Sequence, residues 1–367
     1  MHDRFMAQAL RLARKGLGYT SPNPAVGAVL VRDGHVVGRG YHEQFGGPHA
    51  EVMALAQAGP GARGATLYVT LEPCCHQGKT PPCTRALLEA GVERVYYGMT
   101  DPDPQVAGRG VAELAAGGVK VVTGPLRGKV ERFYEAYAKQ RRTGKPFLTL
   151  KMALSLDGKI ATRTGKSRWI TGERARGYTR RLRGRADAVM VGVGTILADD
   201  PALTTRLPKG RGRDAAAVIV DSYARTPPEA AVFNRQPGAP VYVATTAAAE
   251  PARPKRLEAR GARIVCCQAQ QGRVDLADLL ARLGQMGMLH VICEGGGTLA
   301  ASLLEAGLVD KVLFVLAPKL IGGKDAPTPV EGTGVAALSE ALDLRDLRVR
   351  RLGSDLLVEG YVCSPAS

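Results

Sequence analysis

The feature that most constrains the fold of this chain is an alternation of short apolar, strand-like runs with helix-like runs. A hairpin pattern around Asp33-Gly34 (25–41) is followed by helical runs at 49–58 and 83–91 and strand-like runs at 66–71, 92–98 and 119–124. Strand-like runs then recur at 147–154, 186–192, 216–221, 240–245, 289–295 and 311–318. Strands separated by helices favour a mostly parallel sheet covered on both faces, so we expect an α/β fold.

Gly144, Lys145 and Pro146 interrupt this alternation after a polar helical run at 133–142. A chain of 367 residues has the length of two domains of ~100–200 residues each. We therefore predict one domain at 1–144 and a second at 145–367, each with helices on both faces of a mixed, mostly parallel sheet.

The composition narrows the range of partners. The sequence has no run of ~18 or more apolar residues, and its start predicts an amphipathic helix rather than a secretory leader, so we expect a cytoplasmic protein with no membrane partner. The net charge of +16 attracts anions, whether nucleic acid, membrane phosphate or phosphorylated small molecules. With only 5% aromatic residues, a stacking surface for single-stranded nucleic acid is disfavoured.

Two short motifs in the first domain have the chemistry of a zinc site. One is His49-Ala50-Glu51, and the other runs from Glu72-Pro73-Cys74 to Cys83. A catalytic zinc ion takes three protein ligands and keeps one position open, which His49, Cys74 and Cys83 supply. Glu51, two residues after the histidine, can take a proton from a zinc-activated water and pass it to a departing amine. This H-x-E…P-C…C pattern predicts hydrolytic deamination of a base, and a purely structural zinc site is the alternative.

The second domain contains features that suggest phosphate binding. Gly295, Gly296 and Gly297 follow a strand and precede a helix, where free N–H groups can bind a phosphate, although a tight turn explains them equally well. Arg176, Arg180 and Arg183 fall on one face of a predicted helix. They form either a solvated basic face or a clamp for phosphate.

The first domain resembles the deaminase half of the bifunctional bacterial deaminase–reductases of riboflavin biosynthesis. The resemblance rests on the zinc motifs, on the insertion His76-Gln77-Gly78-Lys79-Thr80-Pro81-Pro82 before Cys83, and on the segments 20–27 and 41–42. It implies a cytidine-deaminase-like fold. It also implies hydrolytic deamination of diaminohydroxyphosphoribosylaminopyrimidine, with substrate contacts from Asn23, His42, His76 and Lys79.

The second domain resembles the reductase half of the same family, which is related in fold to dihydrofolate reductase. The matching segments are 151–161, 167–171, 191–206 and 293–302, and the whole resemblance runs from about Phe5 to Leu357. It implies NADPH-dependent reduction of the ribosyl group to ribityl. The implied cofactor residues are Ala153, Trp169, Thr195, Asp199, Ser222, Gly296, Gly297, Thr298, Leu299, Ala300, Ala301 and Ser302. The implied substrate residues are Lys151, Ser167, Arg183, Leu203, Arg206 and Glu294.

The predicted protein is thus a zinc hydrolase and an NADPH oxidoreductase in one chain. Its cofactors are Zn²⁺ and NADPH, and its partner is a small phosphorylated pyrimidine rather than a nucleic acid; we also expect a homo-oligomer. The alternative is a tRNA-type base deaminase with an accessory phosphate-binding domain, which the zinc motif and the charge of +16 also permit. A non-catalytic, zinc-stabilised phosphate-binding protein is a third possibility, against which the intact Glu51 argues.

Overall fold

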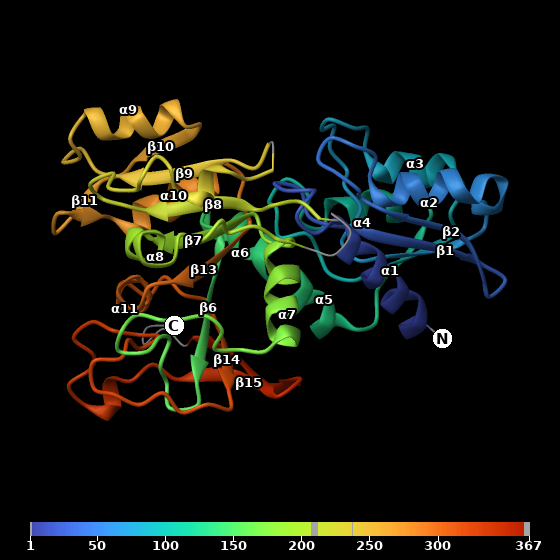
Figure 1. Ribbon diagram of the computed structural model, residues 1–367. Coiled ribbons are helices and arrows are strands. Elements are labelled where there is room, and N and C mark those ends of the chain that lie inside the picture. The colour runs from blue at the N-terminus through green and yellow to red at the C-terminus, as the bar shows by residue number, and fades with distance from the viewer. Residues whose placement is uncertain (1, 207–211, 237, 363–367) are drawn as a thin grey trace. The chain divides into compact units, whose positions relative to one another are not determined.

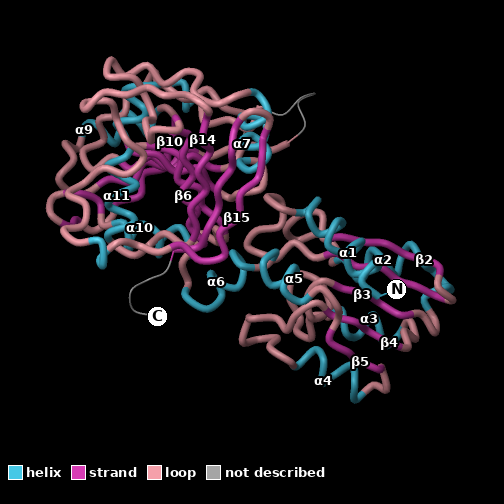
Figure 2. Tube along the Cα trace, turned by 90° about the horizontal axis from the view of Figure 1, so that it is seen from below, coloured by secondary structure: helices cyan, strands magenta, loops and turns pink. Residues whose placement is uncertain are grey.

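Two β-sheets organise the chain, one formed by residues up to Lys145 and one by residues from Pro146 (Figure 1). The computed structural model describes residues 2–206, 212–236 and 238–362. In each unit the strands lie between helices, as the magenta and cyan segments of Figure 2 show. The predicted α/β fold class is confirmed. Among the described residues, no helix has both the length and the apolar content needed to cross a bilayer.

The first sheet has the order β2-β1-β3-β4-β5. Strand β1 pairs antiparallel with β2 and β3, whereas β4 pairs parallel with β3 and β5, so parallel and antiparallel pairings are equal in number here. The strands are β1 (Gly27–Arg32), β2 (His35–Tyr41), β3 (Thr66–Val69), β4 (Arg94–Tyr97) and β5 (Lys120–Thr123). The helices are α1 (His2–Gly16), α2 (Ala50–Ala58), α3 (Cys83–Glu89), α4 (Arg109–Ala116), α5 (Arg127–Phe133) and α6 (Glu135–Thr143), with a 3-10 turn at Gly59–Ala62.

Glycines let two helices approach this sheet closely, one on each face. A Cβ at Gly27 of β1 would lie 2.1 Å from the Ala9 carbonyl oxygen of α1, and a Cβ at Gly40 of β2 would lie 2.1 Å from the Ala50 carbonyl oxygen of α2. Gly40 pairs with Ala28, the neighbour of Gly27 in β1, so the two glycines face opposite sides of the sheet. Helix α2 therefore lies directly on the sheet.

The second sheet has nine strands in the order β10-β9-β8-β7-β13-β6-β14-β16-β15. The pairings from β10 to β14 are parallel, and β16 then pairs antiparallel with β14 and β15. The strands are β6 (Phe147–Ser155), β7 (Ala188–Gly192), β8 (Ala216–Val220), β9 (Val241–Thr245), β10 (Ala262–Cys266), β13 (His290–Gly295), β14 (Lys311–Ala317), β15 (Leu344–Leu352) and β16 (Asp355–Val362). A separate two-stranded ribbon consists of β11 (Ala269–Gln270) and β12 (Arg273–Val274).

Apolar side chains fill both faces of the parallel part of this sheet. One core packs β6, β7 and β8 against α10 (Leu276–Gln285) and α11 (Gly297–Glu305). The opposite core packs the alternate residues of β7, β8 and β9 against α8 (Val193–Asp199) and α9 (Ala252–Ala259). Helix α7 (Glu173–Arg183) packs on β14 and β16, and 3-10 turns lie at Ala231–Phe233 and Leu338–Glu340. The carboxyl ends of the parallel strands remain open, the usual place for a ligand in such sheets.

Candidate active sites

Three side chains that can bind a metal ion converge in the first unit. The ligand atoms of His49, Cys74 and Cys83 all lie within 4.8 Å of one another. His49 Nδ1 lies 3.3 Å from Cys83 Sγ and 3.4 Å from Cys74 Sγ, so Nδ1 is the ring nitrogen that faces both sulfurs. The pKa of the Cys74 thiol falls to about 4, chiefly because the Cys83 thiol hydrogen-bonds to it. One imidazole and two thiolates fit zinc and leave a fourth position open.

The fold places these ligands at the ends of elements. His49 immediately precedes α2, Cys74 follows β3, and Cys83 begins α3. The Cys83 amide N–H donates to Cys74 Sγ over 3.5 Å and so favours negative charge on that sulfur. The second ring nitrogen, His49 Nε2, lies 3.3 Å from Thr80 Oγ1, a partner of the kind that fixes a ligating ring. No sequence pattern marks a loop threonine, so sequence analysis missed Thr80.

Glu51 is a buried carboxyl in the first turn of α2, with 3% of its surface exposed. Burial raises the pKa of this carboxyl to about 7, the charge of Cys74 adds to the rise, and His49 opposes it. Its side chain also hydrogen-bonds with Cys83, so it reaches the metal-binding cluster. A carboxyl that exchanges its proton near neutral pH is suited to general acid–base catalysis.

Two of the predicted substrate residues lie beside this cluster. The His42 ring meets the His49 ring edge-on with centroids 5.1 Å apart, and Asn23 Nδ2 lies 3.4 Å from His42 Nε2. His42 is buried, and its Nδ1 lies 3.0 Å from the Pro48 carbonyl oxygen. Burial lowers the pKa of His42, which favours a neutral ring that can hydrogen-bond through either nitrogen.

The other two predicted substrate residues, His76 and Lys79, are exposed on the loop between Cys75 and Cys83. Lys79 Nζ lies 4.0 Å from the centroid of the Phe45 ring, a cation–π contact with the segment that precedes α2. The same loop carries Thr80, whose hydrogen bond with His49 connects the loop to the metal-binding cluster.

The second unit contains a cavity of about 1610 Å³ at the carboxyl ends of β6, β7, β8 and β13. All the predicted reductase substrate residues line it: Lys151, Ser167, Arg183, Leu203, Arg206 and Glu294. Most predicted cofactor residues also line it: Ala153, Trp169, Thr195, Asp199, Ser222, Gly296, Gly297, Thr298, Leu299 and Ser302. Ala300 and Ala301 do not line the cavity. They are 0% and 2% exposed because the period of α11 turns them toward the core.

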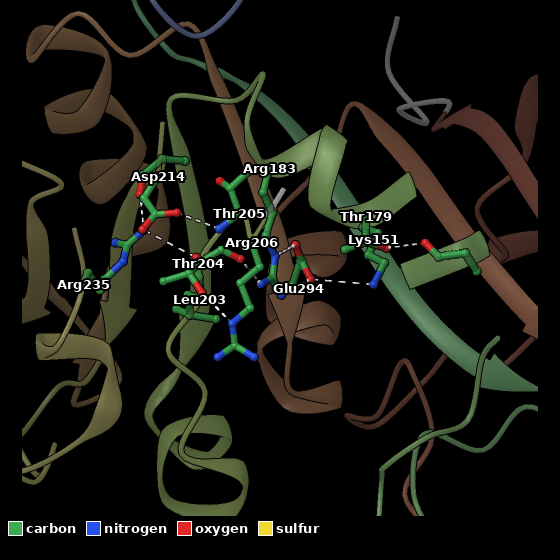
Figure 3. Close-up of polar contacts among 12 residues, drawn as sticks. Lys151, Thr179, Arg183, Leu203, Thr204, Thr205, Arg206, Asp214, Arg235 and Glu294 are labelled. Atoms are coloured by element: carbon green, nitrogen blue, oxygen red, sulfur yellow. Dashed lines mark hydrogen bonds and ion pairs between the residues drawn. The ribbon is translucent and has the colours of Figure 1, made fainter. Parts of the chain in front are cut away.

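A compact charged cluster lies in this cavity (Figure 3). Arg183 Nε and Nη2 donate to the two carboxylate oxygens of Glu294 over 2.7 and 2.9 Å, and Lys151 Nζ lies 3.6 Å from Glu294 Oε2. Burial opposes ionisation of Glu294, but the charges of Arg183 and then Lys151 hold its pKa at about 2. Two cations around one carboxylate leave a surplus positive charge for an anionic ligand.

The glycine turn at the start of α11 forms another part of the wall. Gly296 has φ +83, which favours glycine, and a Cβ at Gly297 would lie 2.5 Å from the Thr328 carbonyl oxygen. Both residues line the cavity and therefore expose backbone to it, as a bound pyrophosphate requires. Nearby, Thr298 Oγ1 donates to Glu331 Oε2 over 2.8 Å.

Hydrogen bonds fix further predicted cofactor residues. Ser167 Oγ donates to Asp199 Oδ1 over 2.9 Å, and Ser222 Oγ accepts from the Val274 amide over 3.0 Å. Trp169 is 61% exposed, and the guanidinium carbon of Arg176 lies 4.6 Å from its ring centroid. An exposed aromatic ring at the wall of a cavity can contact a ligand. The residues around this cavity fit a dinucleotide such as NADPH.

Residues of the cavity wall that the sequence analysis missed include Arg225 and Arg273. Arg273 lies in β12, and Arg225 follows β8. Neither belongs to a motif, and only the fold brings the β11–β12 ribbon to this end of the cavity. Arg176 and Arg180, predicted as a basic face or a clamp, both line the cavity and both pair with Glu173.

Comparison with known proteins identifies the family of the chain. Residues 146–358 match the family described as the RibD C-terminal domain, and residues 1–99 match the cytidine and deoxycytidylate deaminase zinc-binding region. The chain is 41% identical over 361 residues to the riboflavin biosynthesis protein RibD of Actinobacillus pleuropneumoniae, covering 98% of this chain and 95% of that protein. This chain belongs to the RibD family.

Other RibD proteins agree in sequence and in structure. Identity to RibD of Escherichia coli strain K12 is 40%, over 96% of this chain and 97% of that protein. The structure of Acinetobacter baumannii RibD (form 1) superposes with a TM-score of 0.87 at 36% identity and covers 99% of both chains. The diaminohydroxyphosphoribosylaminopyrimidine deaminase/5-amino-6-(5-phosphoribosylamino)uracil reductase of Thermotoga maritima has a TM-score of 0.85 at 35% identity, again over 99% of both chains.

Membership in the RibD family confirms the main functional prediction. The chain is a bifunctional deaminase and reductase of riboflavin biosynthesis, and its cofactors are zinc and NADPH. The alternative of a tRNA-type base deaminase is not supported, because the second half matches the RibD C-terminal domain rather than an accessory domain.

Proposed function

We propose that this member of the RibD family performs two consecutive steps on one phosphorylated pyrimidine. The first converts diaminohydroxyphosphoribosylaminopyrimidine to 5-amino-6-(5-phosphoribosylamino)uracil, and the second reduces the ribosyl group to give 5-amino-6-(5-phosphoribitylamino)uracil. The observation that carries the proposal is one chain with two separate sites, a His/Cys/Cys cluster beside a buried carboxyl and a cavity with a phosphate-compatible turn. We assign residues 1–144 to the deaminase and 145–367 to the reductase.

For the deamination, His49 Nδ1 and the sulfurs of Cys74 and Cys83 would hold the zinc ion, which would supply an activated water when bound. The water oxygen adds to the ring carbon, the bond from that carbon to the exocyclic amine breaks, and ammonia leaves. Glu51 takes one proton from the water and delivers it to the leaving amine, a role that its pKa of about 7 supports. The second water proton ends on the ring nitrogen beside the new carbonyl. Asn23, beside the buried His42, contacts the pyrimidine.

The exposed loop residues His76 and Lys79 contact the rest of that substrate. Lys79 lies above Phe45 and is exposed, so its ammonium group is accessible to an incoming phosphate. Because both residues stand on the loop that carries Thr80, recognition of the substrate and orientation of His49 depend on one segment.

For the reduction, NADPH would supply a hydride to the ribosyl carbon when bound. The bond from that carbon to the ring oxygen would break, and the oxygen would take a proton. The Gly296–Gly297 turn holds the pyrophosphate, and Trp169 contacts another part of the cofactor. The remaining proposed cofactor residues are Ala153, Thr195, Asp199, Ser222, Thr298, Leu299 and Ser302, all of which line the cavity.

The charged cluster binds the sugar end of the reductase substrate. Lys151 holds or polarises the sugar, Arg183 is oriented by Glu294, and Arg206 extends from the cavity wall as an exposed cation. Ser167 and Leu203 complete the substrate wall. The surplus of positive charge around Glu294 supports a phosphorylated substrate.

A single incubation tests this assignment. The phosphorylated diaminopyrimidine is supplied with and without NADPH, and ammonia release and NADPH absorbance are followed separately. Ammonia should appear in both samples, and NADPH consumption should begin only as deaminated product accumulates. NADPH consumption without ammonia release would contradict the order of the two steps.

We also propose a homo-oligomer in the cytoplasm. Strand β15 is the edge of the second sheet, and Leu344, Leu347 and Val349 on it are 40%, 57% and 57% exposed. An edge strand has unpaired backbone groups, and the exposed apolar side chains on it favour pairing with another chain. The described cysteines are all free, which agrees with a reducing compartment. Light scattering during size-exclusion chromatography tests the first proposal, and Leu347→Lys should shift the protein toward the monomer.

A further inference from the structure

The cavity segment 203–206 has a backbone that needs external support. Leu203 has φ +51 and Arg206 has φ +46, both in the left-handed region that branched or long side chains rarely adopt. Such conformations persist where surrounding contacts impose them. Both residues belong to the proposed substrate wall, so the contacts that impose their backbone bear on the reductase site.

Asp214 supplies the first of these contacts. It is 6% exposed, and its Oδ1 accepts a hydrogen bond from the Thr205 amide over 2.6 Å. The adjacent carbonyl of Arg213 accepts from Thr205 Oγ1 over 2.8 Å. Thr205 is itself 2% exposed, so removal of the Asp214 carboxylate would leave a buried N–H without an acceptor.

Arg235 supplies the second contact. Its Nη2 donates to the Leu203 carbonyl over 3.4 Å and also to the Ala215 carbonyl, directly after Asp214. Arg235 Nε and Nη1 and Asp214 Oδ2 are buried and have no hydrogen-bond partner among the described residues. The charge of Asp214 partly offsets the burial that lowers the pKa of Arg235, so the two ions interact electrostatically. Together they hold both the Leu203 and the Thr205 ends of the turn.

The supported segment in turn orients two cations of the site (Figure 3). Arg183 Nη1 donates to the Thr204 carbonyl over 3.0 Å, and Arg206 Nε donates to Thr204 Oγ1 over 2.8 Å. A shift of Thr204 would therefore move the guanidinium of Arg206 and loosen that of Arg183. Neither Asp214 nor Arg235 is among the residues that line the cavity.

We propose that Asp214 and Arg235 are positioning residues of the reductase, which fix the 203–206 backbone so that Arg183 and Arg206 meet the anionic substrate. The proposal rests on the proposed reductase function. It predicts an effect on substrate binding rather than on the cofactor, because the glycine turn and Trp169 belong to other segments of the wall.

The test compares Asp214→Ala with the wild-type full chain, using 5-amino-6-(5-phosphoribosylamino)uracil and NADPH. We expect KM for the uracil substrate to rise about tenfold, the effect of one lost hydrogen bond to a charged group. The kcat should change by less than about threefold, the NADPH dissociation constant from fluorescence quenching should be unchanged, and ammonia release should be normal. Asp214→Asn keeps an acceptor oxygen and should restore most of the affinity.

Asp310→Ala is the matched control, since Asp310 Oδ2 accepts from the Leu148 amide over 2.7 Å at the opposite, amino-terminal edge of the same sheet. It should leave KM unchanged. An unaltered KM in Asp214→Ala, or an equal rise in Asp310→Ala, would overturn the proposal. If Asp214→Ala does not fold, Arg235→Gln provides the same comparison, with the same outcomes. Failure of the proposed function is distinguishable, because the wild type itself would then not consume NADPH with this substrate.

Discussion

Glu51 is buried beside the Cys74 and Cys83 sulfurs and the His49 ring. The loss of hydration raises the pKa of its carboxyl to about 7. Glu294 has the opposite environment. It is equally enclosed, but two cations keep it ionised down to a pKa of about 2. The two carboxyls therefore have different uses, since the first can exchange a proton near neutral pH and the second acts as a fixed negative charge.

Replacement of Glu51 by Gln tests the proton transfer directly. The amide keeps the shape of the side chain but cannot carry the proton, so deamination should fall by about 10²–10⁴-fold. Zinc content, measured by elemental analysis, should stay at the wild-type value because Glu51 is not among the proposed ligands. Glu89→Gln on the exposed surface of α3 is the control. Wild-type turnover in Glu51→Gln would exclude this role.

Lys151→Ala tests the charged cluster of the reductase. NADPH oxidation with deaminated substrate should fall at least ~100-fold, since the group that holds or polarises the sugar is lost. Ammonia release should not change. Asp199→Ala should affect the same step, because Asp199 accepts a hydrogen bond from Ser167 in the cavity wall. Lys166→Ala on the exposed loop nearby is the control, and normal NADPH oxidation in Lys151→Ala would refute the assignment.

The zinc ligands could be predicted because few kinds of site other than a catalytic zinc site use one His, two Cys and a Glu in this order. In the wall of the second cavity, the glycine turn and the arginine face have recognisable patterns. Ser222, Leu203 and Glu294 have none and could be predicted only through resemblance. Thr80, Asp214 and Arg235 were missed because each acts through a backbone or side-chain contact that exists only after folding. The prediction that Ala300 and Ala301 contact the cofactor is wrong because it treats 296–302 as one continuous binding segment. Helix α11 presents only one face to the cavity, and these two residues lie on the other face.

At the scale of elements, the position of α2 on the first sheet controls the metal site. This helix carries Glu51, directly follows His49, and contacts β2 through Gly40. The absence of a Cβ at Gly40 is what allows backbone to meet backbone there. The helix thus brings the acid–base residue and the imidazole to the sulfurs as one rigid unit.

Gly40→Ala should damage the deaminase through this contact. The new Cβ would lie 2.1 Å from the Ala50 carbonyl oxygen and 2.6 Å from the Ala54 nitrogen, so α2 must move. We expect a loss of about 1–3 kcal/mol in stability and weaker zinc retention. Gly128→Ala in α5, where the Cβ meets nothing within 4 Å, should be neutral or stabilising. Thermal unfolding and zinc content of both variants provide the measurement; equal behaviour would contradict the packing argument.

Where β13 pairs with β6, the buried His290 makes the stability of the second unit sensitive to acid. His290 Nε2 lies 2.9 Å from Thr149 Oγ1, and burial lowers the pKa of His290 from 6.5 to about 4. Between pH 6.5 and about pH 4, His290 is therefore protonated in the unfolded chain but neutral in the folded chain. The contribution of His290 to stability is complete above pH 6.5 and is lost as the pH falls toward 4.

His290→Gln should remove this part of the pH dependence. Urea unfolding of the wild type should weaken between pH 7 and pH 5 by up to about 2 kcal/mol more than that of the variant. Carboxyl groups titrate in both proteins and cancel in the comparison. An identical pH dependence in the two proteins would show that the pKa of His290 does not differ between the folded and unfolded states.

At the scale of the whole molecule, the alternation of strands and helices was sufficient to predict the α/β class and the parallel strands up to β14. The antiparallel strands β15 and β16 were not predicted. In β15, the sequence Leu-Arg-Asp-Leu-Arg-Val-Arg-Arg-Leu is largely charged, and the ladder with β16 shifts register between Arg345 and Arg348. Such an edge strand lacks the apolar run that marks a buried parallel strand.

Metal removal separates the two halves of the protein. A chelator that strips the zinc from the full chain should abolish ammonia release, while NADPH oxidation with 5-amino-6-(5-phosphoribosylamino)uracil continues at close to the wild-type rate. The reason is that the His49, Cys74 and Cys83 cluster lies wholly in the first unit and the cavity wall wholly in the second. Restored ammonia release on adding Zn²⁺ is the control. Simultaneous loss of both activities would mean that the reductase fold requires the metal.

The hydrogen bond between Thr80 and His49 couples substrate binding to the retention of zinc. Thr80 lies one residue from Lys79 and belongs to the loop proposed to contact the substrate, while its partner ring faces the metal-binding sulfurs. A substrate that immobilises this loop therefore also immobilises the imidazole and should strengthen zinc binding. Thermodynamic reciprocity then requires that zinc strengthen substrate binding by the same factor. Zinc loss to a chelator should accordingly be slower in the saturated enzyme than in the free one, and Thr80→Val should bring the two rates together.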